Sequence, residues 1–215
     1  FPDFYLGTGN PDLVTVIPNR LFWNEGGKWF RDVTTAAHMG HLQKGHACAF
    51  ADLDNDGDQD VFMNMGGAYT GDIYADVLFS NPGVPTHHWI TLKLEGRTSN
   101  RSAIGARIRV NVETPAGPRS VYRWVNTGGS FGANPLRTEI GLGNATAITS
   151  VEIFWPTTGK TQSVRGLELD RFYRLTEGEP AAQAWVLPAI KLDLARPPAH
   201  PAAAAFLDAL ESFAA

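Results

Sequence analysis

Short runs of alternating apolar and polar residues, bounded by Gly, Asn, Asp or Pro, recur along the chain as far as residue 178. Such runs are typical of β-strands, because successive side chains of a strand point to opposite faces of its sheet. Alternation is clearest in ARIRVNV and SVEIFWP, which predicts strands with one face on a core and the other in solvent. The pattern predicts an all-β protein with strands at 4–6, 47–53, 61–65, 89–96, 106–114, 119–126, 137–143, 150–156 and 171–178.

An internal repeat relates residues 1–26 to residues 58–83 at a constant offset of 57. A fixed period is typical of repeat proteins, in which one unit does not bury its apolar face alone. The alternative is a chance similarity between two strand-turn-strand units. Six positions are identical at this offset, pairing Asp3 with Asp60, Gly9 with Gly66, Leu21 with Leu78, Phe22 with Phe79, Asn24 with Asn81, and Gly26 with Gly83.

In the second copy the repeat is preceded by the acidic hexapeptide DLDNDG, and the first copy begins where that hexapeptide would end. We therefore expect the chain to start in mid-repeat, as the C-terminal part of a larger protein. Further repeats or subunits would then complete the architecture.

The last segment, residues 179–215, is rich in alanine and proline, so its composition differs from the rest of the chain. Its first part, as far as Pro201, is expected to be an extended connector. After it, Phe206, Leu207, Leu210 and Phe213 recur at helical spacing. This spacing predicts a short C-terminal helix that docks by its apolar face.

Charge and composition exclude several classes of function. The net charge of −4 argues against nucleic-acid binding, which needs a basic face. No apolar run approaches the ~20 residues of a membrane-spanning helix. The single cysteine, Cys48, lies in an apolar run and is interpreted as a small buried side chain rather than a catalytic thiol.

The most specific motif is the acidic loop, residues 52–60, with the sequence DLDNDGDQD. Aspartates at its positions 1, 3 and 5 and glycine at position 6 form the first half of a calcium-binding loop. The spacing matters because alternate side chains of a tight turn converge on one point, where a hard cation takes six to eight oxygens. The expected calcium ligands are the side chains of Asp52, Asp54, Asp56 and Asp60 and the main-chain carbonyl oxygen of Asp58.

This loop differs from an EF-hand, because its twelfth position is Met63 instead of a bidentate glutamate and because strands flank it. Magnesium is less suited to it, since that ion keeps several waters and does not call for a cage of carboxylates. An acidic turn in solvent without any metal stays open as the alternative.

The pattern D-x-D-x-D-G-x-x-D between strands resembles the FG-GAP and VCBS repeats of integrin-type β-propellers. NRLFWNEGGKWFRDVT followed by GHACAFADLDNDGDQDVF resembles a blade of such a propeller. HHWITLKLEGRTSNRSAIGARIRV, GGSFGANPLRTEIGLG and SVEIFWPTTGK resemble the UnbV/ASPIC domain. In this order, which covers roughly residues 1–178, they resemble the cartilage acidic protein family and its bacterial relatives.

The resemblance implies integrin-like FG-GAP propeller-blade repeats in residues 1–83 and an antiparallel β-sandwich-like UnbV/ASPIC domain in residues 84–178. The tail, residues 179–215, lies outside it. The resemblance further implies bound calcium, a secreted (extracellular) or periplasmic location, and no enzymatic activity.

Three histidines and one polar turn are weaker candidates. His38, His41 and His46 lie close in sequence, and a transition-metal site is weighed against a structural or solvent-exposed role. Residues 100–107, NRSAIGAR, form either a ligand site or a buried turn held by hydrogen bonds of Arg101. Asn100 and Asn144 have the form of glycosylation acceptors, but the sequence does not decide whether they are modified.

Three functions are compared. The first is a non-catalytic, calcium-binding adhesion or interaction module with a protein or glycan partner. The second is a structural subunit of a larger extracellular complex or filament. The third, less favoured, is a metal-dependent hydrolase that uses histidines and aspartates of residues 38–60. A cation caged by protein oxygens would leave no catalytic position and would favour the first two.

Overall fold

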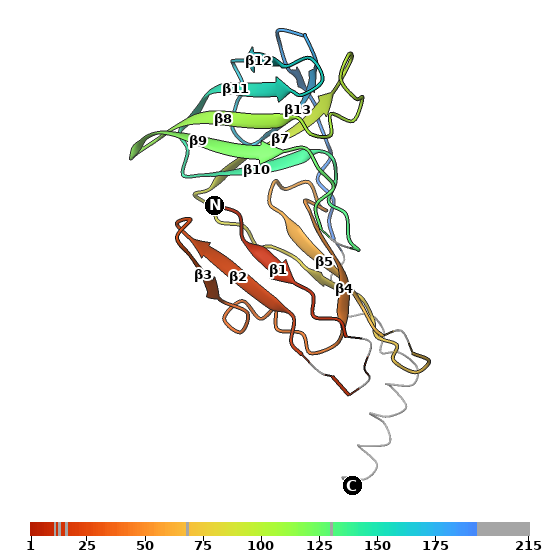
Figure 1. Cartoon of the computed structure of the whole chain (residues 1–215). Helices are drawn as coiled ribbons and strands as arrows, with labels where there is room; N and C mark the ends of the chain where they lie inside the picture. Colours follow the sequence, from red (N-terminus) through yellow and green to blue (C-terminus); the bar gives the residue numbers. More distant parts are fainter. Residues whose placement is uncertain (11, 13, 16, 68, 130, 193–215) are drawn as a thin grey trace.

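The computed structural model describes residues 1–192 apart from residues 11, 13, 16, 68 and 130 (Figure 1). Its regular elements are all strands, so the predicted all-β class is confirmed for the described residues. The helix expected after Pro201 lies outside them. The strands are β1 (Phe4–Leu6), β2 (Arg20–Glu25), β3 (Trp29–Asp32), β4 (Gly45–Ala51), β5 (Asp60–Met65), β6 (Val77–Phe79), β7 (His88–Glu95), β8 (Arg107–Thr114), β9 (Gly117–Trp124), β10 (Thr138–Gly143), β11 (Ala147–Trp155), β12 (Lys160–Val164), β13 (Arg171–Thr176) and β14 (Gln183–Ala184).

The N-terminal part contains two three-stranded antiparallel sheets, β1-β2-β3 and β4-β5-β6. Their strand pairings repeat at the same offset of 57 as the sequence. Phe4 lies opposite Phe22 in the first sheet, and Val61 lies opposite Phe79 in the second. The next two pairs of each hairpin correspond in the same way. The sequence repeat is therefore a structural repeat, with identical register.

The hydrogen bonds beside these hairpins repeat as well. Asp3 accepts from the backbone N–H of Asn24 at 2.7 Å, and Asp60 accepts from that of Asn81 at 2.9 Å. In each copy the asparagine amide also donates to the carbonyl that precedes the aspartate. The matched aspartates and asparagines thus tie the start of one strand to the end of the next.

The core of this N-terminal part is small. It consists of Tyr5, Met39, Val61, Met63 and Met65, with partly buried neighbours around them. The first sheet, β1-β2-β3, meanwhile leaves four large aromatic residues exposed: Phe4, Trp23, Trp29 and Phe30. A small core together with exposed aromatic residues is typical of a repeat unit, because such a unit normally buries part of its apolar surface against a neighbouring repeat.

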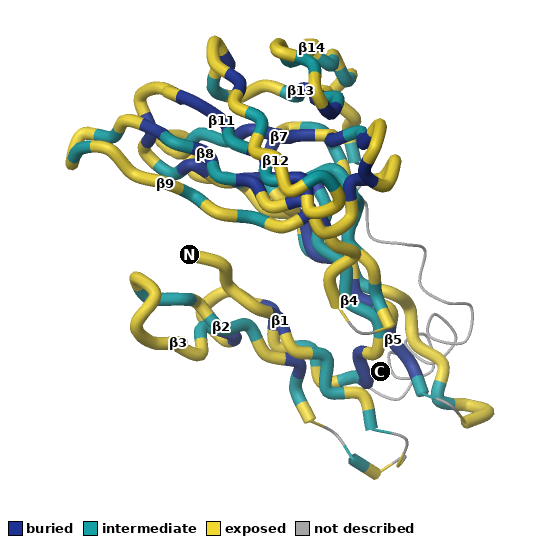
Figure 2. The backbone as a smooth tube through the Cα atoms, turned by 45° about the horizontal axis from the view of Figure 1, so that its top comes forward, coloured by how far each residue is buried: buried dark blue, intermediate teal, exposed yellow. Residues whose placement is uncertain are grey.

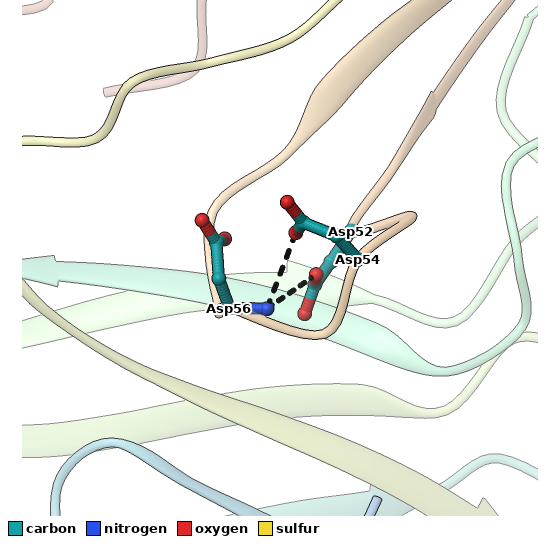
Figure 3. Close-up of side chains that lie close together, drawn as sticks. All are labelled: Asp52, Asp54 and Asp56. Carbon is teal, nitrogen blue, oxygen red and sulfur yellow. Dashed lines mark hydrogen bonds between the residues drawn. The ribbon is translucent and has the colours of Figure 1, made fainter. Parts of the chain in front are cut away.

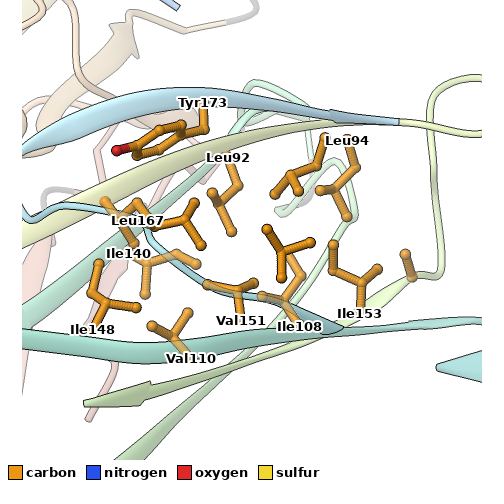
Figure 4. Packing of buried hydrophobic residues seen from close by; sticks show 14 of the residues in the cluster. Leu92, Leu94, Ile108, Val110, Ile140, Ile148, Val151, Ile153, Leu167 and Tyr173 are labelled. Carbon is orange, nitrogen blue, oxygen red and sulfur yellow. The ribbon is translucent and has the colours of Figure 1, made fainter. Parts of the chain in front are cut away.

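The C-terminal part packs two four-stranded sheets, β10-β7-β13-β14 and β12-β11-β8-β9, around a larger core (Figure 4). Most dark, buried residues in Figure 2 belong to this part. The core follows from the alternation of the strands, because Ile108, Val110 and Val112 of β8 point inward while Arg107 and its alternate neighbours point out. The predicted sandwich-like arrangement is therefore present.

One pairing differs from the expectation of a wholly antiparallel domain. β13 runs parallel to β7, with Arg171 opposite Ile90. The expectation is wrong here because β7 and β13 are separated by the entire second sheet, and so no hairpin dictates their direction. Residues beyond 178 extend the same sheet, since β14 pairs with β13 through Tyr173 and Ala184.

None of the described residues belongs to a helix that is long and apolar enough to cross a membrane.

Candidate metal site

The acidic loop connects β4 to β5, which form an antiparallel hairpin with Ala51 opposite Asp60. Two of its residues have left-handed backbone conformations, Asn55 with φ of 61° and Gly57 with φ of 102°. Asparagine tolerates this region better than most residues, and glycine adopts it without steric cost. These two positions turn the chain back, as the glycine in the motif predicts.

Asp52, Asp54 and Asp56 gather on one side of this turn (Figure 3). One carboxylate oxygen from each lies within 4.8 Å of the others, close enough for all three to share an ion. The loop's own amides hold the group, since the N–H of Asp56 donates to Asp52 at 3.1 Å and to Asp54 at 3.3 Å. The N–H of Gly57 also donates to Asp52, at 3.2 Å.

The other two predicted ligands flank this trio. Asp60 opens β5 and is buried, and its two oxygens accept from the N–H groups of Leu53 at 3.2 Å and Asn81 at 2.9 Å. Asp58 is partly buried, and its Oδ1 atom is a buried oxygen for which the described residues provide no hydrogen-bond donor. The structure thus brings three predicted ligands together, while the parts played by Asp58 and Asp60 stay predictions.

The crowded carboxylates are costly to ionise together. Burial raises the pKa of Asp52 to about 6, although the charge of Arg137 partly opposes this rise. Burial also raises the pKa of Asp58 to about 7, and the charges of Asp56, Asp60, Asp54 and Asp52 raise it further. The pKa of Asp54 is raised for the same reasons, burial first and the charge of Asp56 next.

This set of groups fits a hard cation. It offers only oxygen atoms, it concentrates negative charge, and Asp58 Oδ1 is a buried acceptor that lacks a donor. A bound divalent ion would offset the repulsion between the carboxylates and would take up free lone pairs. The cluster of Asp52, Asp54 and Asp56 is therefore able to hold a metal ion.

The loop also touches residues that the sequence did not point to. Arg137 and Glu139, which lie just before and within β10, hydrogen-bond to the loop, and Trp89 of β7 lies against Gly57. Sequence reasoning assigned residues 137–143 to a strand only. The signal in the sequence was that Arg137 and Glu139, two charged residues two positions apart, lie on the same face of that predicted strand.

The weaker candidates do not form a second metal-binding cluster among the described residues, and the ligand-site interpretation of residues 100–107 stays a prediction. In the part of the chain that the structure describes, no histidine belongs to a metal-binding cluster. His41 packs edge-on against Tyr74 at 5.1 Å, and its Nδ1 accepts from the N–H of Gln43. The prediction that Arg101 holds a buried turn at residues 100–107 is wrong. The Arg101 side chain is exposed and forms an ion pair with Glu95 at 2.5 Å. Backbone hydrogen bonds close the turn instead, such as the one from the Ala103 N–H to the Asn100 carbonyl.

Two family models match the chain. Residues 3–63 match an FG-GAP-like repeat, which includes β1 to β4 and the acidic loop. Residues 96–182 match the family described as ASPIC and UnbV, which includes β8 to β13. No curated protein matches the chain. The chain therefore carries an FG-GAP-like repeat, residues 3–63, followed by an ASPIC/UnbV domain, residues 96–182.

Proposed function

We propose that the chain is a non-catalytic, calcium-binding interaction module of the extracellular space or the periplasm. The observation that carries the proposal is the acidic loop, in which Asp52, Asp54 and Asp56 converge and Asp58 Oδ1 is buried without a donor. Calcium suits this loop better than magnesium, because calcium accepts a flexible cage of many oxygens.

Calcium in such a module is structural. The ion would neutralise carboxylates that repel one another and would fix a turn at the end of the β4–β5 hairpin. Extracellular calcium modules bind with Kd of about 10⁻⁴–10⁻³ M, which matches the calcium levels outside cells rather than inside them. The proposed extracellular or periplasmic location therefore predicts a Kd in this range for the acidic loop.

Exposed aromatic residues support the interaction role. Trp23, Trp29 and Phe30 lie on the surface of the first sheet, and Tyr122 and Trp124 are neighbours on one face of β9. Aromatic side chains dominate the energetics of protein interfaces. A protein or glycan partner is therefore the proposed ligand class, and a subunit of a larger complex or filament is the variant in which the partner is permanent. A hydrolase is less favoured, because a cation saturated by protein oxygens, as proposed for this loop, would have no open coordination position.

The decisive test is calorimetric titration of the metal-free chain with Ca²⁺ and, separately, with Mg²⁺. We expect one Ca²⁺ per chain, weaker Mg²⁺ binding, and a raised thermal unfolding midpoint in Ca²⁺. At about ten times Kd the gain in stability is ~1.4 kcal/mol.

Two variants make this test specific. Asp54→Asn should abolish or strongly weaken Ca²⁺ binding. Glu168→Gln, which removes the same charge at an exposed ion pair with Arg171, should not. Failure of the unaltered chain to bind millimolar Ca²⁺ would overturn the proposal.

A further inference from the structure

The acidic loop does not stand free at the end of its hairpin, because β10 of the ASPIC/UnbV domain contacts its backbone. Glu139 is buried, and its Oε2 accepts from the N–H of Asp52 at 3.1 Å and from the side-chain amide of Gln59 at 2.8 Å. One carboxylate of the second domain thus accepts hydrogen bonds from both ends of the loop.

Arg137 contacts the loop beside Glu139. Its guanidinium donates to the main-chain carbonyl of Asp52 and, at 3.0 Å, to Oδ1 of Asn55. It also donates to Oε1 of Glu139 at 2.8 Å, so the two residues support each other. Both main-chain groups of Asp52, the first residue of the carboxylate trio, are therefore bonded to the second domain.

Two more contacts enclose the loop. Gly57 lies so close to the indole of Trp89 that a Cβ atom on it would come within 1.8 Å of Trp89 Cε2. On another side, the segment after β14 reaches the loop, where the Pro188 carbonyl accepts from Asn55 at 2.9 Å and the N–H of Ile190 donates to the Asp54 carbonyl at 2.7 Å. In addition to Asn81, three separate segments that follow the loop in the chain thus contact it.

These contacts fix the direction of the carboxylates rather than donating to them. Mutation of groups that orient the ligands of a metal ion typically costs about 10–100-fold in metal affinity. The placement is also electrostatically unusual, because Arg137 brings a positive charge next to a site for a cation. Because the positive charge of Arg137 repels a bound cation, Arg137 can favour cation binding only through the conformation that its hydrogen bonds impose on the loop.

We propose that Arg137 and Glu139 are positioning residues for the cation, and that cation binding and docking of the ASPIC/UnbV domain onto the FG-GAP-like repeat are coupled. The inference rests on the proposed calcium-binding function. Coupling is reciprocal: if the docked domain raises the affinity for Ca²⁺, then Ca²⁺ tightens the docking by the same factor. The ion would in this way set the rigidity of the junction between the two domains.

Arg137→Met tests the idea, because charge and shape make opposite predictions. Removal of a nearby positive charge would by itself strengthen Ca²⁺ binding. Loss of the positioning contacts should instead weaken it by about tenfold or more. Arg109→Met is the matched control, since it removes the same charge from an ion pair with Glu152 on the other sheet and should leave Kd unchanged.

Calorimetry distinguishes failure of the inference from failure of the proposed function. Weaker binding in Arg137→Met with an unchanged control supports the inference. Equal or tighter binding in Arg137→Met overturns it and leaves the proposed function intact. Absence of binding in the unaltered chain overturns the proposed function and the inference with it.

Hydrogen exchange of the unaltered chain gives a second test that does not depend on a variant folding. With Ca²⁺, backbone amides of residues 137–141, 89–92 and 189–190 should exchange more slowly, together with those of the loop. Protection restricted to residues 52–60 would contradict the coupling.

Discussion

Replacement of Glu177 by glutamine should destabilise the ASPIC/UnbV domain. Glu177 follows β13 and is buried beneath the turn at residues 97–99. Its Oε2 accepts from the N–H groups of Arg97, Thr98 and Ser99 at 2.8, 2.9 and 2.8 Å, and its Oε1 accepts from the Ser99 hydroxyl at 2.9 Å. Three converging amides form a site that an anion fills and a neutral amide side chain fills less well.

The size of the effect follows from the pKa of Glu177. Burial alone would raise that pKa, but the hydrogen bonds from Ser99, Arg97 and Thr98 outweigh burial and lower it from 4.5 to about 2. One pKa unit corresponds to about 1.4 kcal/mol, so the ionised carboxylate contributes about 3 kcal/mol to stability above pH 4.5. Because the folded-state pKa is the lower one, this contribution is lost as the pH falls, and about 1.4 kcal/mol remains at pH 3.

Thermal unfolding followed by circular dichroism measures this contribution. At pH 7, Glu177→Gln should lower the midpoint by about 6–12 °C. Glu168→Gln serves as the control, because its exposed ion pair with Arg171 is worth at most ~1 kcal/mol. Equal losses in the two variants at pH 7 would refute the reasoning, as would a difference between Glu177→Gln and the unaltered chain that stays constant between pH 7 and pH 3.

Three further predictions concern other positions. Gly57→Ala should lower the thermal unfolding midpoint more than Gly117→Ala does. Both glycines have positive φ, but only at Gly57 would a Cβ atom meet Trp89, because nothing lies within 4 Å of a Cβ atom at Gly117. Equal losses would contradict the close packing between the two domains. Leu92→Ala, in the centre of the large core, should lower the free energy of unfolding in urea by about 2–5 kcal/mol, and a loss below ~1 kcal/mol would contradict its packing. Cys48 is partly buried, and this burial raises the pKa of its thiol to about 11. It should therefore react with iodoacetamide at pH 8 far more slowly in the folded chain than in denaturant, and equal rates would argue against its partial burial.

The features that the sequence determined are local ones. Strand positions such as 106–114 were predicted because alternation depends only on neighbouring residues and shows directly in the letters. The trio Asp52, Asp54 and Asp56 was predicted because its members lie within five residues of one another, so a single turn brings them together. The repeat was visible for a similar reason, since short segments that share six residues at a constant offset adopt the same hairpin in the same register. Strand β12, KTQSV, escaped prediction because only Val164 of its five residues is buried, which leaves no alternation to detect.

Tertiary structure decided which distant segments meet. The parallel pairing of β7 with β13 and the burial of Glu177 under residues 97–99 join positions about 80 residues apart. Arg137 and Glu139 reach Asp52 across 85 and 87 residues. Such contacts depend on how two cores pack against each other, and no local preference of the chain encodes them. The sequence thus specified a loop with the chemistry to bind a cation, whereas only the packing of the second domain determined how that loop is held.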